Sequence, residues 1–434
     1  PTASTGFRRG SQVLPVLAAV LAVGAVVAGY VFYGLAGGAT YADAAAARDR
    51  GDCTAAIPGY GLVSGMYELT LSGNVPRAEA ERAECVAFVA ASDAEAGGDF
   101  AGAVALNQEF RLAHPDTTLA PYVDDNVRRT YESWGTSLRS SGEYDEAVRV
   151  YRDLLVEIGD GPEADGVRGE LAATLVEQAD ALRTQLPGLT GPALVDAIRD
   201  STENLLTVQR EFAETPAAAG VAQAIVDTYA AARTQTGCDA LPLLDYAVGL
   251  PDAETAGVVG TANADRVRAQ FDCGVARYQA GQWAESGTAF DQVQADYPND
   301  PLVAQARANG IAAEVSEVTG SPQPLPGPYA GDNPGSIPLT LYNDNPAEVR
   351  VLIAGPTAHE VVLPGCPGCP AEYPSSVGAC PSLDGKPSFR LTLPAGGYTV
   401  IGQYPSADPS VQSNLVESGF EYTNCLFVTP IPGQ

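Results

Sequence analysis

Four cysteines near the C-terminus are the residues whose spacing is best suited to chemistry. Cys366 and Cys369 form a C-x-x-C pair, and Cys380 and Cys425 follow in the same stretch. Four thiolates in this arrangement can hold a structural zinc ion tetrahedrally. Two disulfides would instead staple a domain of under about 100 residues. We expect the disulfides, because the chain is predicted below to be exported, and zinc is the alternative.

Thiol redox catalysis is a third use of the C-x-x-C pair. It requires the first cysteine at a helix N-terminus, where its pKa is lowered. Here Pro367 and Pro370 follow the two cysteines, and the surrounding segments are predicted to be strands. The sequence therefore gives this enzyme hypothesis little support.

Other catalytic sets are missing from the sequence. The chain has two histidines, His114 and His359, and they fall in different predicted domains. Adjacent carboxylates such as Asp124 and Asp125 are expected on solvated helix faces in a chain with 53 acidic residues. No nucleophile elbow, Walker loop or H-E-x-x-H motif occurs. We therefore expect a non-enzymatic protein without a cofactor.

A short signature recurs along the chain: a glycine, one residue, an aromatic residue or cysteine, two residues, then a small residue. Its copies begin at Gly51, Gly98, Gly142 and Gly281. Each stands between two apolar-periodic stretches, which predicts a tight turn between antiparallel helices. We expect the glycine to tolerate the backbone, the aromatic residue to pack into the partner helix, and the small residue to let the helices approach.

This pattern resembles the tetratricopeptide repeat over residues 41–318, through its turn motif and closing prolines such as Pro115 and Pro298. The resemblance implies an all-α solenoid that binds a protein or peptide. Successive glycines at 51, 98 and 142 lie 47 and 44 residues apart, longer than the family's usual spacing of about 34. The stretch from Gly159 to Gly237 carries no clear copy.

Four cysteines in this helical region occur as two similar pairs. The segment around Cys53 and Cys85 is duplicated around Cys238 and Cys273, with separations of 32 and 35 residues. In both copies a turn cysteine precedes one on the first helix of the next pair, and stacked pairs bring those faces together. We predict disulfides Cys53–Cys85 and Cys238–Cys273, and four buried free cysteines are the alternative.

An uncharged segment near the N-terminus predicts a membrane anchor and the side of the membrane on which the chain lies. Residues 13–39 exceed the roughly 20 needed to span a bilayer. Arg8 and Arg9 precede this segment and Asp43 follows, so the N-terminus should be cytoplasmic and the bulk of the chain extracytoplasmic. A cleaved signal peptide is the alternative, although its apolar core is usually shorter. Because the only methionine is Met66, we expect the natural chain to begin before Pro1.

The amino-acid composition indicates which partners the protein can bind and from what kind of organism it comes. A formal net charge of -29 makes nucleic acid an unlikely ligand, because its phosphates would be repelled. Lys386 is the only lysine, whereas alanine, glycine, valine and arginine abound, the bias of a GC-rich bacterium such as an actinobacterium. Eight cysteines agree with an oxidising compartment.

The C-terminal region changes period after a stretch dense in proline and glycine. Alternating segments at 339–342, 349–353, 359–363, 389–393, 398–404 and 420–428 predict an antiparallel β-sandwich. Its strand at 391–393 and the tyrosine-led strand after it resemble transthyretin-like and immunoglobulin-like bacterial sandwiches. We expect the stretch from Ser321 to Pro338 to let the sandwich move independently of the repeats.

Together these patterns predict a multidomain chain. The predicted parts are a cytoplasmic stub (1–12), a transmembrane helix (13–39), a tetratricopeptide-like domain (41–318), a linker (319–337) and a β-sandwich with four cysteines (338–434). The expected function is a membrane-anchored scaffold for proteins or peptides in cell-envelope assembly or regulation. A sandwich that binds carbohydrate or another small ligand through Tyr373, Tyr404 and Tyr422 is the alternative.

Overall fold

The computed structural model describes residues 13–69, 73–233, 235–251, 254–255, 257–327, 335–374 and 382–429. Within these residues α-helices come first and β-strands follow, in the order that the sequence predicts. The chain forms two compact units, Pro1–Gln178 with Phe212–Ala218, and Ala179–Glu211 with Ala219–Gln434. The linker predicted at 319–337 therefore lies inside the second unit.

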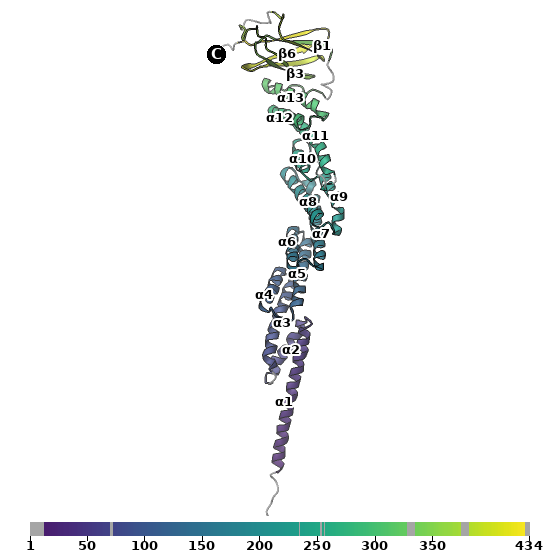
Figure 1. Ribbon diagram of the computed structural model, residues 1–434, viewed down its shortest axis with the longest axis vertical. Coiled ribbons are helices and arrows are strands. Elements are labelled where there is room, and N and C mark those ends of the chain that lie inside the picture. Colours follow the sequence, from purple (N-terminus) through teal and green to yellow (C-terminus); the bar gives the residue numbers. More distant parts are fainter. Residues whose placement is uncertain are drawn as a thin grey trace, which may run out of the picture. The chain divides into compact units, whose positions relative to one another are not determined.

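Within each unit, most helices pack against a helix next to them in the chain (Figure 1). The first unit holds α1 (Val13–Arg48), α2 (Cys53–Met66), α3 (Asn74–Ala96), α4 (Phe100–Ala113), α5 (Ala120–Ser141), α6 (Tyr144–Ile158) and the start of α7 (Pro162–Gln185). The second holds α8 (Gly191–Glu211), α9 (Val221–Ala232), α10 (Leu241–Val248), α11 (Val258–Gln279), α12 (Trp283–Asp296) and α13 (Leu302–Thr319). Short 3₁₀ helices are η1 (Leu186–Gly188), η2 (Pro216–Gly220) and η3 (Gly237–Ala240).

The recurring signature forms the turn before α2, α4, α6 and α12, as predicted. Its four glycines all have a positive φ, between 77° and 82°, a conformation that disfavours other residues. Each helix begins two residues after its glycine, and the small residue three positions further is fully buried: Ala56, Ala103, Ala147 and Ser286. In two copies an aspartate, Asp52 or Asp99, caps the new helix by accepting a bond from a backbone N–H.

The residue that packs into the preceding helix differs from the prediction. The aromatic residue of the turn is only partly buried, as at Tyr144 and Trp283. Two helical turns later, on the same face, Tyr151 and Phe290 are fully buried. Tyr151 packs on Gly135, where an added Cβ would lie 2.5 Å from the ring, and Phe290 packs in the same way on a glycine of α11.

A single helix, α1, joins the apolar segment to the first helix pair. It continues past the predicted end of the span at residue 39 to Arg48. Ala44 and Ala47 are buried against the neighbouring helices. The stretch from Leu17 is long and apolar enough to cross a membrane, and its most apolar window is not buried at all. A signal sequence would share these features.

Two sheets follow α13. The strands are β1 (Ile337–Asn343), β2 (Val349–Ala354), β3 (Ala358–Leu363), β4 (Ser388–Leu393), β5 (Gly396–Tyr404), β6 (Ala407–Val416) and β7 (Tyr422–Leu426). Their order is β4-β1-β7 in one sheet and β3-β2-β5-β6 in the other, and both sheets contribute to one apolar core. The prediction of purely antiparallel pairing is wrong for β1 and β7, which are parallel.

The second sheet also packs against a helix, in contrast to the independence expected from the linker. Val351 and Ile353 of β2 face the core between the sheets, whereas Leu352, on the opposite face, packs with Ile311 and Val315 of α13. Figure 1 shows α13 next to this sheet. The proline-rich composition predicted a spacer, but it did not reveal that β2 is apolar on both faces.

Polar bonds reinforce this junction. Arg350 of β2 forms a two-pronged ion pair with Glu314 of α13, with its Nη2 at 2.9 Å from one carboxylate oxygen. The Nε of Arg350 lies 2.6 Å from Glu360 of β3. Gln403 of β5 donates a further bond to Glu314. Contacts between α13 and the sheet are therefore both apolar and charged.

Candidate functional site

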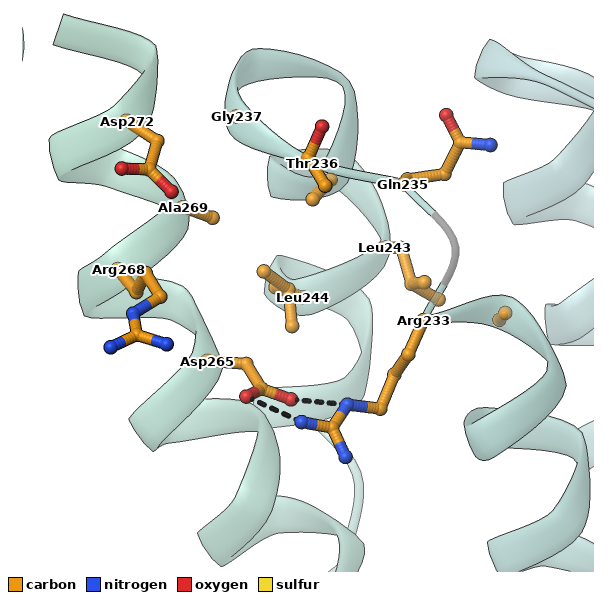
Figure 2. A pocket seen from close by; sticks show the side chains of 12 residues that line it. Arg233, Gln235, Thr236, Gly237, Leu243, Leu244, Asp265, Arg268, Ala269 and Asp272 are labelled. Carbon is orange, nitrogen blue, oxygen red and sulfur yellow. Dashed lines mark hydrogen bonds and ion pairs between the residues drawn. The ribbon is translucent and has the colours of Figure 1, made fainter. Parts of the chain in front are cut away.

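A cavity of about 190 Å³ lies between α9, η3, α10 and α11 in the second unit (Figure 2). Leu243 and Leu244 of α10 are buried and form an apolar part of its wall. Arg233, Asp265, Arg268 and Asp272 bring charge to the same cavity. The site thus joins an apolar surface to charges of both signs.

One pair of these charges is bonded. Arg233 Nε lies 2.7 Å from an Asp265 oxygen, and Figure 2 shows the two side chains at one end of the cavity. The hydroxyl of Tyr229 donates to Asp265 over 3.2 Å. Burial and, next, the charge of Asp265 raise the pKa of Tyr229 above its ordinary value, so the tyrosine stays a neutral donor.

The other two charges are available to a ligand. Arg268 and Asp272 stand one helical turn apart on α11. Neither forms an ion pair or side-chain hydrogen bond within the part of the chain that the structure describes. A bound group can therefore meet a guanidinium and a carboxylate without breaking existing bonds.

A disulfide holds this region together. Cys238 of η3 is bonded to Cys273 of α11, and Cys53 of α2 is bonded to Cys85 of α3, which are the two pairs predicted from the sequence. Next to Cys238, Gly237 has a φ of 58° and lies against the backbone of Cys273. The disulfide fixes the start of α10 beside α11, and with it the walls of the cavity.

The C-terminal cysteines are paired where the structure describes them. Cys366 is bonded to Cys369, and Cys425 also belongs to a disulfide. Cys380 lies outside the described residues. A sulfur in a disulfide is not a thiolate ligand, so this arrangement corresponds to the disulfide alternative rather than to zinc. The described residues include no cluster of three or more His, Cys, Asp or Glu able to hold a metal ion.

Beside the Cys366–Cys369 disulfide lies a buried charge pair that the sequence analysis missed. Asp344, whose side chain is fully buried, forms an ion pair with Lys386 and accepts a bond from the Tyr373 hydroxyl over 2.7 Å. Burial and the bond to Asp344 raise the pKa of Tyr373 to about 12. The uniqueness of Lys386 was visible in the sequence, but its partner lies 42 positions away and no local spacing connects them.

The aromatic residues proposed for small-ligand binding do not form an exposed strip. Tyr404 belongs to the core between the sheets, Tyr422 packs against that core, and Tyr373 is bonded to Asp344. The hydroxyls of Tyr404 and Ser410 are buried close together, where burial raises the pKa of Tyr404 and the Ser410 hydroxyl partly offsets this, and both residues line a cavity of about 790 Å³. This cavity was not predicted.

The histidines and acidic pairs have local partners. His114 ends α4 and its ring lies 4.7 Å from that of Phe110, while His359 bonds to Thr357. Asp124 pairs with Arg111 and Asp125 with Arg128. These side chains take part in local contacts on their own elements or with neighbouring helices.

Comparisons with known proteins add no relative to these observations. No protein-family model matches the chain, and no curated protein matches it. The likeness to tetratricopeptide repeats rests on residues of this chain alone, namely the turn glycines and the small residues buried after them.

Proposed function

We propose that this chain is a membrane-anchored, extracytoplasmic scaffold that binds a protein or peptide through tetratricopeptide-like helix pairs. The apolar start of α1 supports the anchor, and the disulfides support an oxidising compartment. The four turns with positive-φ glycines support a repeated helical hairpin. In this proposal the two sheets form a sandwich that packs on the last helix of the array.

The cavity beside the Cys238–Cys273 disulfide is the observation that carries the proposal. Its volume of about 190 Å³ is below the roughly 300 Å³ at which pockets for drug-sized ligands begin. It suits one side chain of a larger partner. Leu243 and Leu244 offer the apolar contact, while Arg268 and Asp272 bind polar groups of the partner backbone or of neighbouring side chains.

Site-specific photo-crosslinking in the native host tests this binding site. A photoreactive phenylalanine analogue replaces Thr236, which lines the cavity and is exposed. We expect a covalent adduct with another protein, several-fold stronger than with the same analogue at Val156, which is 85% exposed on α6. Adding Arg268→Ser should weaken the adduct, because it removes an unpaired charge from the site.

Two results would contradict the proposal. One is an adduct at Thr236 no stronger than at Val156. The other is an adduct that Arg268→Ser leaves unchanged, since the partner would then lie near the cavity without using it. Because Arg268 is exposed and has no ion pair in the described residues, its loss should not disturb folding.

A second candidate function is the binding of a carbohydrate or another small ligand by the sandwich. Its support is the cavity of about 790 Å³ that Tyr404 and Ser410 line. A cavity of this volume falls in the range of about 300–1,000 Å³ typical of small-ligand pockets. In this reading the helices position the sandwich and do not themselves bind the ligand.

A further inference from the structure

The end of the α2–α3 hairpin lies beside the apolar part of α1. α2 ends at Met66 and α3 begins at Asn74, and the described start of the loop between them, Tyr67–Leu69, is level with Tyr30 and Tyr33 of α1. Figure 1 shows α1 continuing beyond this hairpin as a lone helix. The loop is therefore the part of α2 and α3 closest to any membrane that α1 spans.

Two tyrosines of α1 bond directly to the loop backbone. The Tyr30 hydroxyl donates to the carbonyl oxygen of Leu69 over 2.9 Å, and the Tyr33 hydroxyl donates to that of Met66. The last carbonyls of a helix have no partner within it. In water they would be hydrated, but near hydrocarbon an unbonded carbonyl costs several kcal/mol. These tyrosines supply donors that water would otherwise provide.

A ring and a glycine fix the loop against α1. The Tyr67 ring packs over Gly37, where an added Cβ would lie 2.9 Å from ring carbon Cγ. Its centroid is 5.0 Å from that of Tyr33. The level of the loop along α1 is thus set by contacts on three consecutive turns of the helix.

The last turns of α2 and the start of the loop carry exposed apolar side chains. Leu62, Met66 and Leu69 are 47%, 63% and 76% exposed. We call these three residues the loop patch. Isolated exposed apolar residues are ordinary on a protein surface. Here, however, the exposed apolar residues lie next to the unburied apolar part of α1, so together with α1 they form a larger apolar surface.

The length of α1 decides how deep this patch lies. A bilayer core takes about 20 helical residues. In any placement of those residues within 13–39, Tyr30 falls inside the hydrocarbon core and Tyr33 falls inside it or within about one residue of its edge. With the spanning residues at about 13–32, Tyr30 lies just inside the outer edge of the core and Tyr33 just outside it, and the groups bonded to them lie at the membrane interface.

We infer that the loop patch inserts into the outer interface of the membrane that α1 spans, so the helical array has a second lipid contact. This inference rests on the membrane anchor of the proposed function. Leu62, Met66 and Leu69 enter the boundary between headgroups and acyl chains, and exposed Glu68 stays among the headgroups. The second contact restrains rotation of the array about α1, which a single helix would allow.

Fluorescence quenching in vesicles tests the insertion with the full-length protein. Leu69→Cys carries an environment-sensitive dye, in phosphatidylcholine vesicles whose lipids bear a nitroxide near the headgroup. Labelling proceeds without reductant, so that the disulfides persist, and wild-type protein gives the background. Leu112→Cys is the matched control, because Leu112 is 85% exposed at the end of α4. Phe32→Cys, 72% exposed on α1, reports on the anchor.

We expect the nitroxide to quench the Leu69 dye at least threefold more than the Leu112 dye, and also to quench the Phe32 dye. A dye at Leu62→Cys should be quenched less when Met66→Asp is added than in Leu62→Cys alone, since a charge at position 66 disfavours insertion into the membrane. Quenching at Leu69 equal to that at Leu112, with Phe32 quenched, would overturn the inference and leave the anchor standing. No quenching at Phe32 would overturn the anchor and the inference together.

Discussion

Small residues determine how closely neighbouring helices can approach. Gly274 of α11 packs against Phe290 of α12, and Gly135 of α5 packs against Tyr151 of α6 in the same way. The sequence motif predicted the turn glycine and the small residue after it. It did not predict Gly135 or Gly274, because nothing local marks the residue that a ring two helical turns beyond the turn will touch.

Substitution of Gly274 should therefore be costly. In Gly274→Ala the new Cβ would lie 2.7 Å from the Phe290 ring, so the buried ring or one of the two helices must shift. We expect a loss of about 1–3 kcal/mol in the free energy of unfolding. Urea denaturation of the detergent-solubilised chain measures it.

Gly287→Ala is the matched control for that measurement. Gly287 is also helical, and its added Cβ meets no atom within 4 Å. Alanine should stabilise α12 there by up to about 1 kcal/mol. Equal effects of the two substitutions would contradict the close packing of Phe290 on α11.

Elements whose apolar residues recur at one regular spacing were predictable from the sequence. Elements whose pattern is interrupted, or which are covered by a different partner on each face, were not. The alternation in β1 identified a strand, and its burial pattern follows it. β6 was missed because Pro409 and several polar residues interrupt the alternation of apolar and polar residues. β6 lies at the edge of its sheet, where such residues are tolerated. The contact between β2 and α13 was missed because a strand that is apolar on both faces carries no signal for which partner covers the second face.

The ion pair at this junction gives the sheets an acid-sensitive contact. The bond to Arg350 holds the pKa of Glu360 below its ordinary value of about 4.3. The folded chain therefore resists protonation of Glu360 more than the unfolded chain does. Its contribution to stability is complete above about pH 4.3 and is lost as the pH falls through the lowered pKa.

Arg350→Gln should flatten this pH dependence. Trp134→Phe in both proteins leaves Trp283 as the reporter of the second unit, and unfolding followed by its fluorescence between pH 5 and 3 should show a shallower slope than without Arg350→Gln. Arg390→Gln is the control in the same unit, because it removes an ion pair with Glu421, which is 56% exposed. A wild-type slope in Arg350→Gln would mean that other groups carry the acid response.

At the scale of the whole molecule, the sequence predicted the order of parts but not their division. The change of period after residue 320 correctly separated helices from strands. The compact units divide instead within the helical region, near Gln178, because α8 to α13 and both sheets share one unit. Proline and glycine content marks where regular structure stops, whereas a unit boundary depends on long-range packing that no local window contains.

Each unit contains one disulfide between helices and one tryptophan. Cys53–Cys85 and Trp134 belong to the first unit, and Cys238–Cys273 and Trp283 belong to the second. The disulfides close loops of 32 and 35 residues. Restriction of the unfolded chain by loops of that length corresponds to about 3–4 kcal/mol. We therefore expect each disulfide to stabilise mainly the unit that contains it.

Paired serine substitutions test this expectation, with Trp134→Phe or Trp283→Phe leaving one reporter in each protein. Under oxidising conditions, Cys53→Ser with Cys85→Ser should lower the urea midpoint reported by Trp134 and leave that of Trp283 nearly unchanged. Cys238→Ser with Cys273→Ser should do the reverse. If either pair lowered both midpoints equally, the two units would unfold as one cooperative body, and the disulfides would act on the whole chain rather than on the helices they join.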